Sequence, residues 1–179
     1  MVRETDLYLP VKEFLEARGY TVKSEVQDCD VVAVKDEEPV VVVELKLTFS
    51  MDLVLQGIQR QNITDDVYVA VCAPDTLAKH RNWRSRQRDY KKLCRRLGLG
   101  LMIVNPDTSR ERNVNVLVDP GPYVPRKIKR QKTRLMLEFA KRTGDPNTGG
   151  ANRTRIITAY RQDALRCAMA LNRQGSLKV

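Results

Sequence analysis

The stretch CDVVAVKDEEPVVVVELKL, residues 29–47, decides the fold class of this chain. Its two runs of β-branched residues predict adjacent strands, and the acidic segment 36–39 between them predicts a hairpin turn. Because side chains alternate between the two faces of a strand, Glu44 and Lys46 project to the same side. The hairpin brings Asp30 beside Glu44, so two carboxylates and one lysine are expected to share a small patch.

These three side chains make a chemically coherent group. Paired carboxylates suit Mg²⁺ or Mn²⁺, which bind acidic oxygens and keep waters for a substrate phosphate. Such a metal activates water at a phosphodiester, and a lysine orients that water or stabilises the developing charge. Asp30 and Glu44 are therefore the candidate metal ligands, and Lys46 is a candidate catalytic residue. The competing interpretation is a surface ion pair between Glu44 and Lys46, although charges in so apolar a strand are costly unless they are satisfied.

The rest of the first 125 residues alternates between helical and strand patterns. A buried parallel strand is predicted at 65–73, because this nearly continuous apolar run follows a crossover helix. The order predicts an α/β fold, a mixed sheet flanked by helices. The expected helices are 4–18, Ser50 to about 62, and 77–97, and the expected strands are 20–26, 29–35, 40–47, 65–73, 100–105 and 113–118.

A change of composition after the stiff segment DPGPYVP, residues 119–125, predicts a domain boundary. We expect a first domain at 1–125 and a small basic region at 126–179, built from two helices around a glycine-rich loop. The second region holds 14 Lys and Arg against three acidic residues. That charge exceeds what solubility requires and favours contact with a nucleic-acid backbone. The alternative is a solvated basic face packed on the first domain.

Charge is distributed unevenly along the whole chain. Residues 1–78 hold 15 acidic residues against seven Lys and Arg, whereas residues 79–96 hold nine Lys and Arg against one acid. An acidic half with a metal site joined to basic segments is typical of a polyanion-binding protein with a metal centre. The candidate nucleic-acid-binding residues are Arg84, Arg88, Lys91, Lys92, Arg130, Lys132, Arg134, Arg153 and Arg155.

The single histidine and the four scattered cysteines exclude several classes of protein. With a single histidine, His80, the chain lacks the imidazoles of serine hydrolase triads and histidine-rich metal sites. The four cysteines form no CxxC pair or Cys/His cluster, so reduced thiols are expected. No apolar run is long enough for a membrane span, and the start lacks a signal-peptide pattern. We therefore expect a soluble, cytoplasmic protein.

Asp at the start of the second strand and ExK at the end of the third resemble the PD-(D/E)xK phosphodiesterase superfamily, which includes restriction endonucleases and Holliday-junction resolvases. The resemblance implies a restriction-endonuclease-like sheet with an αβββαβ core. It assigns Asp30 and Glu44 to metal binding and Lys46 to catalysis. Gln56 lies in the following helix, where several branches keep glutamine as QxxxY. Here residues 56–60 read QGIQR, and the tyrosine is absent.

Longer segments are similar to a bacterial family of PD-(D/E)xK phosphodiesterases of unknown role. They are LYLPVKEFLEARGYTVKSEV, CDVVAVK and VVVELKL, together with GDPNTGG and TAYRQDALRCA near the C-terminus. The resemblance covers nearly the whole chain. In some relatives acids from the first helix reach the metal site, so Glu4, Glu13 and Glu25, the last on the preceding strand, are further candidate acids.

The expected function is that of a Mg²⁺- or Mn²⁺-dependent nuclease that hydrolyses phosphodiester bonds in DNA. The alternative is a non-catalytic nucleic-acid-binding module on a degenerate nuclease scaffold. RNA or an acidic protein is a weaker alternative for the basic regions. Trp83 and Tyr90 have the charged neighbours of base-stacking residues, but their helical spacing favours a place in the core.

Overall fold

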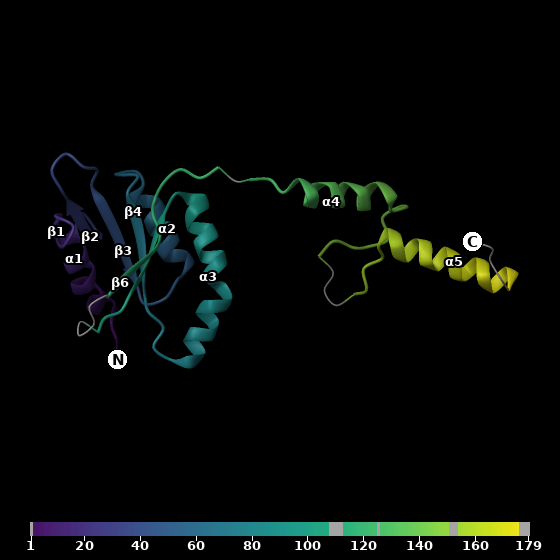
Figure 1. The fold of residues 1–179 in the computed structure, drawn as a ribbon, viewed down its shortest axis with the longest axis horizontal. Coiled ribbons are helices and arrows are strands. Elements are labelled where there is room, and N and C mark those ends of the chain that lie inside the picture. Colours follow the sequence, from purple (N-terminus) through teal and green to yellow (C-terminus); the bar gives the residue numbers. More distant parts are fainter. Residues whose placement is uncertain (1, 108–112, 125, 151–153, 176–179) are drawn as a thin grey trace. The chain divides into compact units, whose positions relative to one another are not determined.

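A six-stranded mixed sheet forms the centre of the first part of the chain (Figure 1). The strands follow one another across the sheet in sequence order. Pairing is parallel between β3 and β4 and between β4 and β5, and antiparallel elsewhere. The predicted α/β fold is therefore confirmed. The strands are β1 (Thr21–Val26), β2 (Cys29–Val34), β3 (Val41–Lys46), β4 (Val67–Cys72), β5 (Gly100–Val104) and β6 (Val114–Val118).

This computed structural model describes residues 2–107, 113–124, 126–150 and 154–175. The chain divides into two compact units, Met1–Pro125 and Arg126–Val179. Among the described residues, no helix is both long and apolar enough to cross a membrane.

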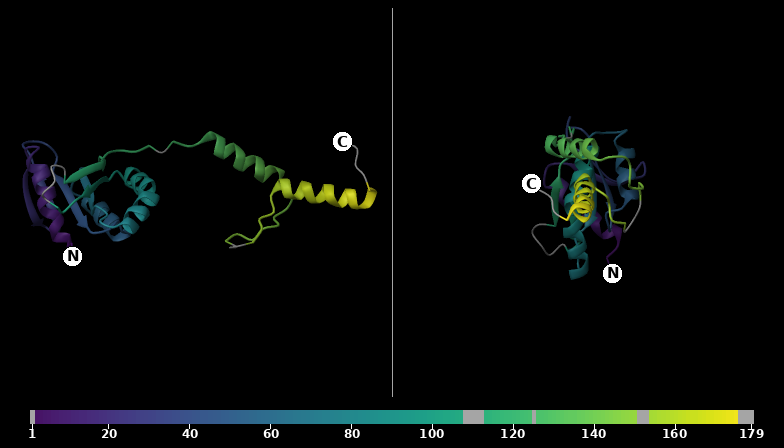
Figure 2. Two further views of the ribbon diagram at one scale, coloured as in Figure 1. Left: turned by 60° about the horizontal axis from the view of Figure 1, so that its bottom comes forward. Right: turned by 90° about the vertical axis from the view of Figure 1, so that its right-hand side faces the viewer.

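Helices cover both faces of the sheet. The short helix η1 (Glu4–Leu7) leads into α1 (Tyr8–Glu16) on one face, and α2 (Met51–Arg60) and α3 (Leu77–Leu97) lie on the other (Figure 2, left). Ser50 Oγ caps α2 by accepting a hydrogen bond from Leu53 N at 3.2 Å. Gly98 ends α3 with a φ of 73°, a left-handed conformation that glycine adopts at little cost.

Strand alternation divides the buried side chains into two cores. In β3, Val43 and Leu45 pack with Val11 of α1, whereas Val42 packs with Leu53 of α2. Glu44 lies on the same face of β3 as Val42. It is the one charged residue that is buried in the described part of the chain, with 1% of its surface exposed. A carboxylate thus lies where the pattern of the strand calls for an apolar side chain.

The second unit consists of α4 (Lys129–Lys141), α5 (Ala159–Gln174) and the loop between them. Polar contacts hold the loop: Asn147 exchanges two hydrogen bonds with the Ile157 backbone, at 2.7 and 2.8 Å. Glu138 on α4 accepts a hydrogen bond from Ala159 N at 3.0 Å. Most apolar side chains of both helices, Phe139 and Tyr160 included, are exposed. Side-chain hydrogen bonds, more than a buried core, therefore connect the described parts of this unit.

Candidate active site

The β2–β3 hairpin brings Asp30 and Glu44 together. Its antiparallel register pairs Val31 with Val43, and the same register continued by one residue places Asp30 opposite Glu44. Leu45 N donates a hydrogen bond to Asp30 Oδ2 at 2.7 Å, which fixes the orientation of this carboxylate. The expected neighbourhood of the two acids follows from the same pairing that makes the hairpin.

Glu44 is an incompletely satisfied buried acid. Its Oε1 accepts a hydrogen bond from Arg60 Nε at 2.5 Å, whereas its Oε2 is buried with no hydrogen-bond partner among the described residues. The pKa of Glu44 is raised above its usual value, mainly because the carboxyl is buried. The hydrogen bond from Arg60 opposes this shift, and the nearby charge of Asp30 adds to it. A buried polar atom without a partner costs about 1–3 kcal/mol. A divalent cation shared by Glu44 Oε2 and Asp30 would satisfy that oxygen, so the donor set fits a metal.

Sequence reasoning missed Arg60, which has the closest contact with Glu44. Arg60 ends α2, one turn after Gln56 on the same helix face, and Nη2 also donates to the carbonyl oxygen of Asp28. It occupies the last position of the 56–60 segment, where several related branches keep tyrosine. The departure from that motif was visible in the sequence. The contact of Arg60 with Glu44 could not be predicted from the sequence.

We expect Arg60→Ala to destabilise the protein by about 3–5 kcal/mol, because removing one partner leaves the other charge buried and unpaired. Thermal and urea unfolding of the full chain would measure the loss. Glu44→Gln in the same chain should recover much of it, since a neutral amide needs no counter-charge. Strictly additive losses in the double variant would show that the two side chains are not coupled.

Lys46 contacts a different acid. Its Nζ lies 3.2 Å from Glu4 Oε2, and both side chains are partly exposed. The alternative expectation of an ion pair between Glu44 and Lys46 is therefore not what the structure has, because each side chain has another partner. Such an exposed pair contributes little to stability and is easily exchanged for another contact. Lys46 is thus free to turn toward an anion at the end of β3.

A cavity of about 290 Å³ opens beside Asp30. Two further candidate acids, Glu4 and Glu25, line it with Asp30. Glu13 does not line it and is exposed on α1. Within the described ranges, no group of three or more Asp, Glu, His or Cys side chains is gathered closely enough to hold a metal. The site therefore offers two carboxylates, with remaining positions for backbone oxygen or water, as Mg²⁺ commonly has.

The other candidate residues are spread over three helices and a loop. Gln56 is half-buried on α2, and its Oε1 has no hydrogen-bond partner among the described residues. Arg153 lies outside the described residues. The roles of the basic residues stay predictions; Lys91 is half-buried, and the exposed ones are Arg84, Arg88 and Lys92 on α3, Arg130, Lys132 and Arg134 on α4, and Arg155 before α5.

The mixed sheet, with the two neighbouring acids of its β2–β3 hairpin, is consistent with a restriction-endonuclease-like core. The chain matches the model of a family described as "Putative PD-(D/E)XK phosphodiesterase (DUF2161)" over residues 102–179. The match confirms the family resemblance predicted from the sequence and supports a phosphodiesterase or nuclease activity in general. It does not include Asp30, Glu44 or Lys46, so their assignment rests on the motif and the geometry. No curated protein matches the chain.

Proposed function

We propose that this protein is a Mg²⁺-dependent nuclease that hydrolyses phosphodiester bonds in DNA, with Asp30 and Glu44 as metal ligands. The observation that carries the proposal is the buried Glu44 Oε2, which has no hydrogen-bond partner among the described residues and lies near a second carboxylate, Asp30. A purely structural acid at this depth would be expected to have both oxygens satisfied. The match to a phosphodiesterase family supports the same chemistry.

Each side chain has a distinct part in this proposal. Leu45 N–H orients Asp30, and Arg60 holds Glu44 through Oε1, which leaves Glu44 Oε2 and the second Asp30 oxygen to bind a metal. A bound divalent metal would supply Lewis-acid stabilisation of the phosphate and activation of water. Lys46 leaves Glu4, orients the attacking water and stabilises negative charge as it develops. Gln56, on the helix face of Arg60, supports the water or the lysine.

The basic segments would hold the substrate backbone. On α3, the exposed arginines and lysines outnumber the acids, and the unit Arg126–Val179 carries a further basic excess. We propose that the first unit is the nuclease domain and that the second binds nucleic acid. Lysine and arginine displace condensed counterions from phosphates, which makes this contribution strong at low salt and independent of sequence.

One contact favours a second candidate, a non-catalytic nucleic-acid-binding module. The guanidinium of Arg60 already compensates the charge of Glu44, as a scaffold that had lost its metal would require. In that case nucleic acid binds, but no metal-dependent reaction follows.

Cleavage with and without metal separates the two candidates. Linear, circular, single-stranded and branched DNA, together with RNA, would be incubated with the protein in Mg²⁺, in Mn²⁺ and in chelator. We expect cleavage of DNA only in the metal lanes, because the two carboxylates need a cation to act on phosphate. Binding of all substrates without any cleavage would overturn the nuclease proposal in favour of the binding module.

A further inference from the structure

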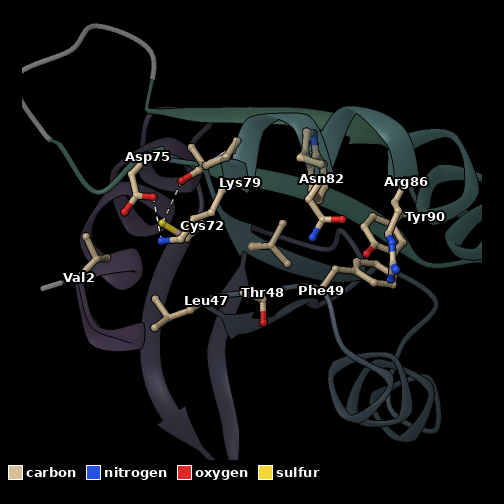
Figure 3. Close-up of a pocket in the computed structure, with 14 residues that line it drawn as sticks. Val2, Leu47, Thr48, Phe49, Cys72, Asp75, Lys79, Asn82, Arg86 and Tyr90 are labelled. Carbon is tan, nitrogen blue, oxygen red and sulfur yellow. Dashed lines mark hydrogen bonds and ion pairs between the residues drawn. The ribbon is translucent and has the colours of Figure 1, made fainter. Parts of the chain in front are cut away.

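A second, larger cavity of about 610 Å³ lies where the parallel strands β3 and β4 end (Figure 3). Leu47, Thr48 and Phe49 line it directly after β3, and Ala73 and Pro74 line it after β4. In open α/β sheets, ligands commonly bind outside the carboxyl ends of parallel strands. The volume lies within the range of about 300–1,000 Å³ that is usual for small-molecule sites. Leu47, which lines the cavity, directly follows Lys46 in the sequence.

Aromatic side chains form one wall of this cavity. The rings of Phe49 and Tyr90 are stacked, with centroids 4.1 Å apart and an angle of 19° between their planes. The ring centroids of Trp83 and Tyr90 are 5.5 Å apart. All three rings are partly buried and pack on the core, as expected for Trp83 and Tyr90, yet they also line the cavity. Packing therefore holds this group of aromatic rings in place at the cavity wall.

Polar and cationic groups complete the cavity from α3. Asn82 and Arg86 reach from this helix toward the segment Leu47–Phe49 (Figure 3). Both are exposed, and Arg86 forms no ion pair with any described residue. Lys79 is held by Asp75 at 2.8 Å. The cavity thus combines a ring surface, an amide with donors and an acceptor, and an uncompensated cation.

We propose that this cavity binds one unpaired nucleotide of the nucleic-acid substrate, with the base against the aromatic wall, Asn82 on its polar edge and Arg86 on a phosphate. This inference rests on the proposed function and specifies its substrate class: DNA with a single-stranded or frayed segment. A base in an intact duplex must first be unstacked and unpaired to enter such a cavity, at a cost that an already single-stranded base does not have. A purely apolar ligand would leave Asn82 and Arg86 without a role.

The single tryptophan of the chain, Trp83, reports on this cavity directly. In chelator, where no cleavage occurs, we expect a short single-stranded DNA to quench Trp83 fluorescence, while a blunt duplex of the same sequence does not. Binding would be followed in parallel by fluorescence anisotropy of labelled DNA. The assay needs no metal, so the quenching can be observed even if the protein cleaves nothing. Equally, metal-dependent cleavage can be observed even if single-stranded DNA does not quench Trp83.

Two substitutions and one matched control test the assignment. Phe49→Leu removes a stacking ring but keeps an apolar side chain, and we expect about tenfold weaker single-strand binding, within the range measured for one base stack. Arg86→Ala, at an exposed position, should weaken it about as much. Arg81→Ala removes the same charge from an exposed position of α3 that does not line the cavity, and should have a smaller effect.

The proposal is overturned by single-strand binding that leaves Trp83 fluorescence unchanged, by equal quenching with the blunt duplex, or by equal losses from Arg86→Ala and Arg81→Ala. Should Phe49→Leu fail to fold, the exposed pair of arginines still decides the question.

Discussion

Asp30→Asn, Glu44→Gln and Lys46→Ala are each expected to reduce metal-dependent cleavage at least a hundredfold. The three groups act on the metal and the transition state, and a hundredfold loss corresponds to only about 2.7 kcal/mol of activation free energy. Initial rates on the DNA substrate that the wild-type protein cleaves would measure the effect. Glu37→Gln, an exposed acid in the hairpin turn, is the matched control and should keep the wild-type rate.

Binding and stability measurements separate lost catalysis from lost folding. Circular dichroism and DNA affinity should change little in the three variants. Mg²⁺ should raise the unfolding temperature of the wild-type protein, since a ligand present at 100 times its dissociation constant stabilises the folded state by about 2.7 kcal/mol. That shift should vanish in Asp30→Asn and Glu44→Gln and persist in Lys46→Ala. A wild-type cleavage rate in any variant would remove that residue from the mechanism.

Deleting residues 126–179 is expected to weaken DNA binding strongly and to flatten its dependence on salt. The removed unit carries 14 Lys and Arg against three acids, and each lost phosphate contact lowers the log–log salt slope by about 0.9 on duplex DNA. Affinity titrations at several salt concentrations would measure both changes. The truncated protein should remain folded, because both cores described above lie within Met1–Pro125.

A single substitution gives a graded version of this experiment. Arg155→Ala, at an exposed position, should lower affinity by a similar factor for different DNA sequences, because phosphate contacts position a protein without reading bases. The truncated protein should retain its Mg²⁺-dependent thermal shift. Unchanged affinity and salt slope after truncation would assign α4 and α5 to packing or self-association instead.

Local patterns in the sequence were sufficient to predict most of the fold. Alternating and continuous β-branched runs predicted the hairpin of β2 and β3 and the buried parallel strand β4. Ser50 and Gly98 marked helix ends, because capping and left-handed turns depend on a few neighbouring residues. The neighbourhood of Asp30 and Glu44 followed from the same logic, since a short hairpin permits few registers.

Only the tertiary structure decided which partners those residues have. Arg60 on Glu44 and Glu4 on Lys46 join side chains separated by 16 and 42 positions in the sequence. The aromatic cavity likewise depends on how α3 packs against the ends of β3 and β4. Such contacts depend on the packing of helices against the sheet, and side-chain periodicity specifies which face is buried but not which atoms meet across it.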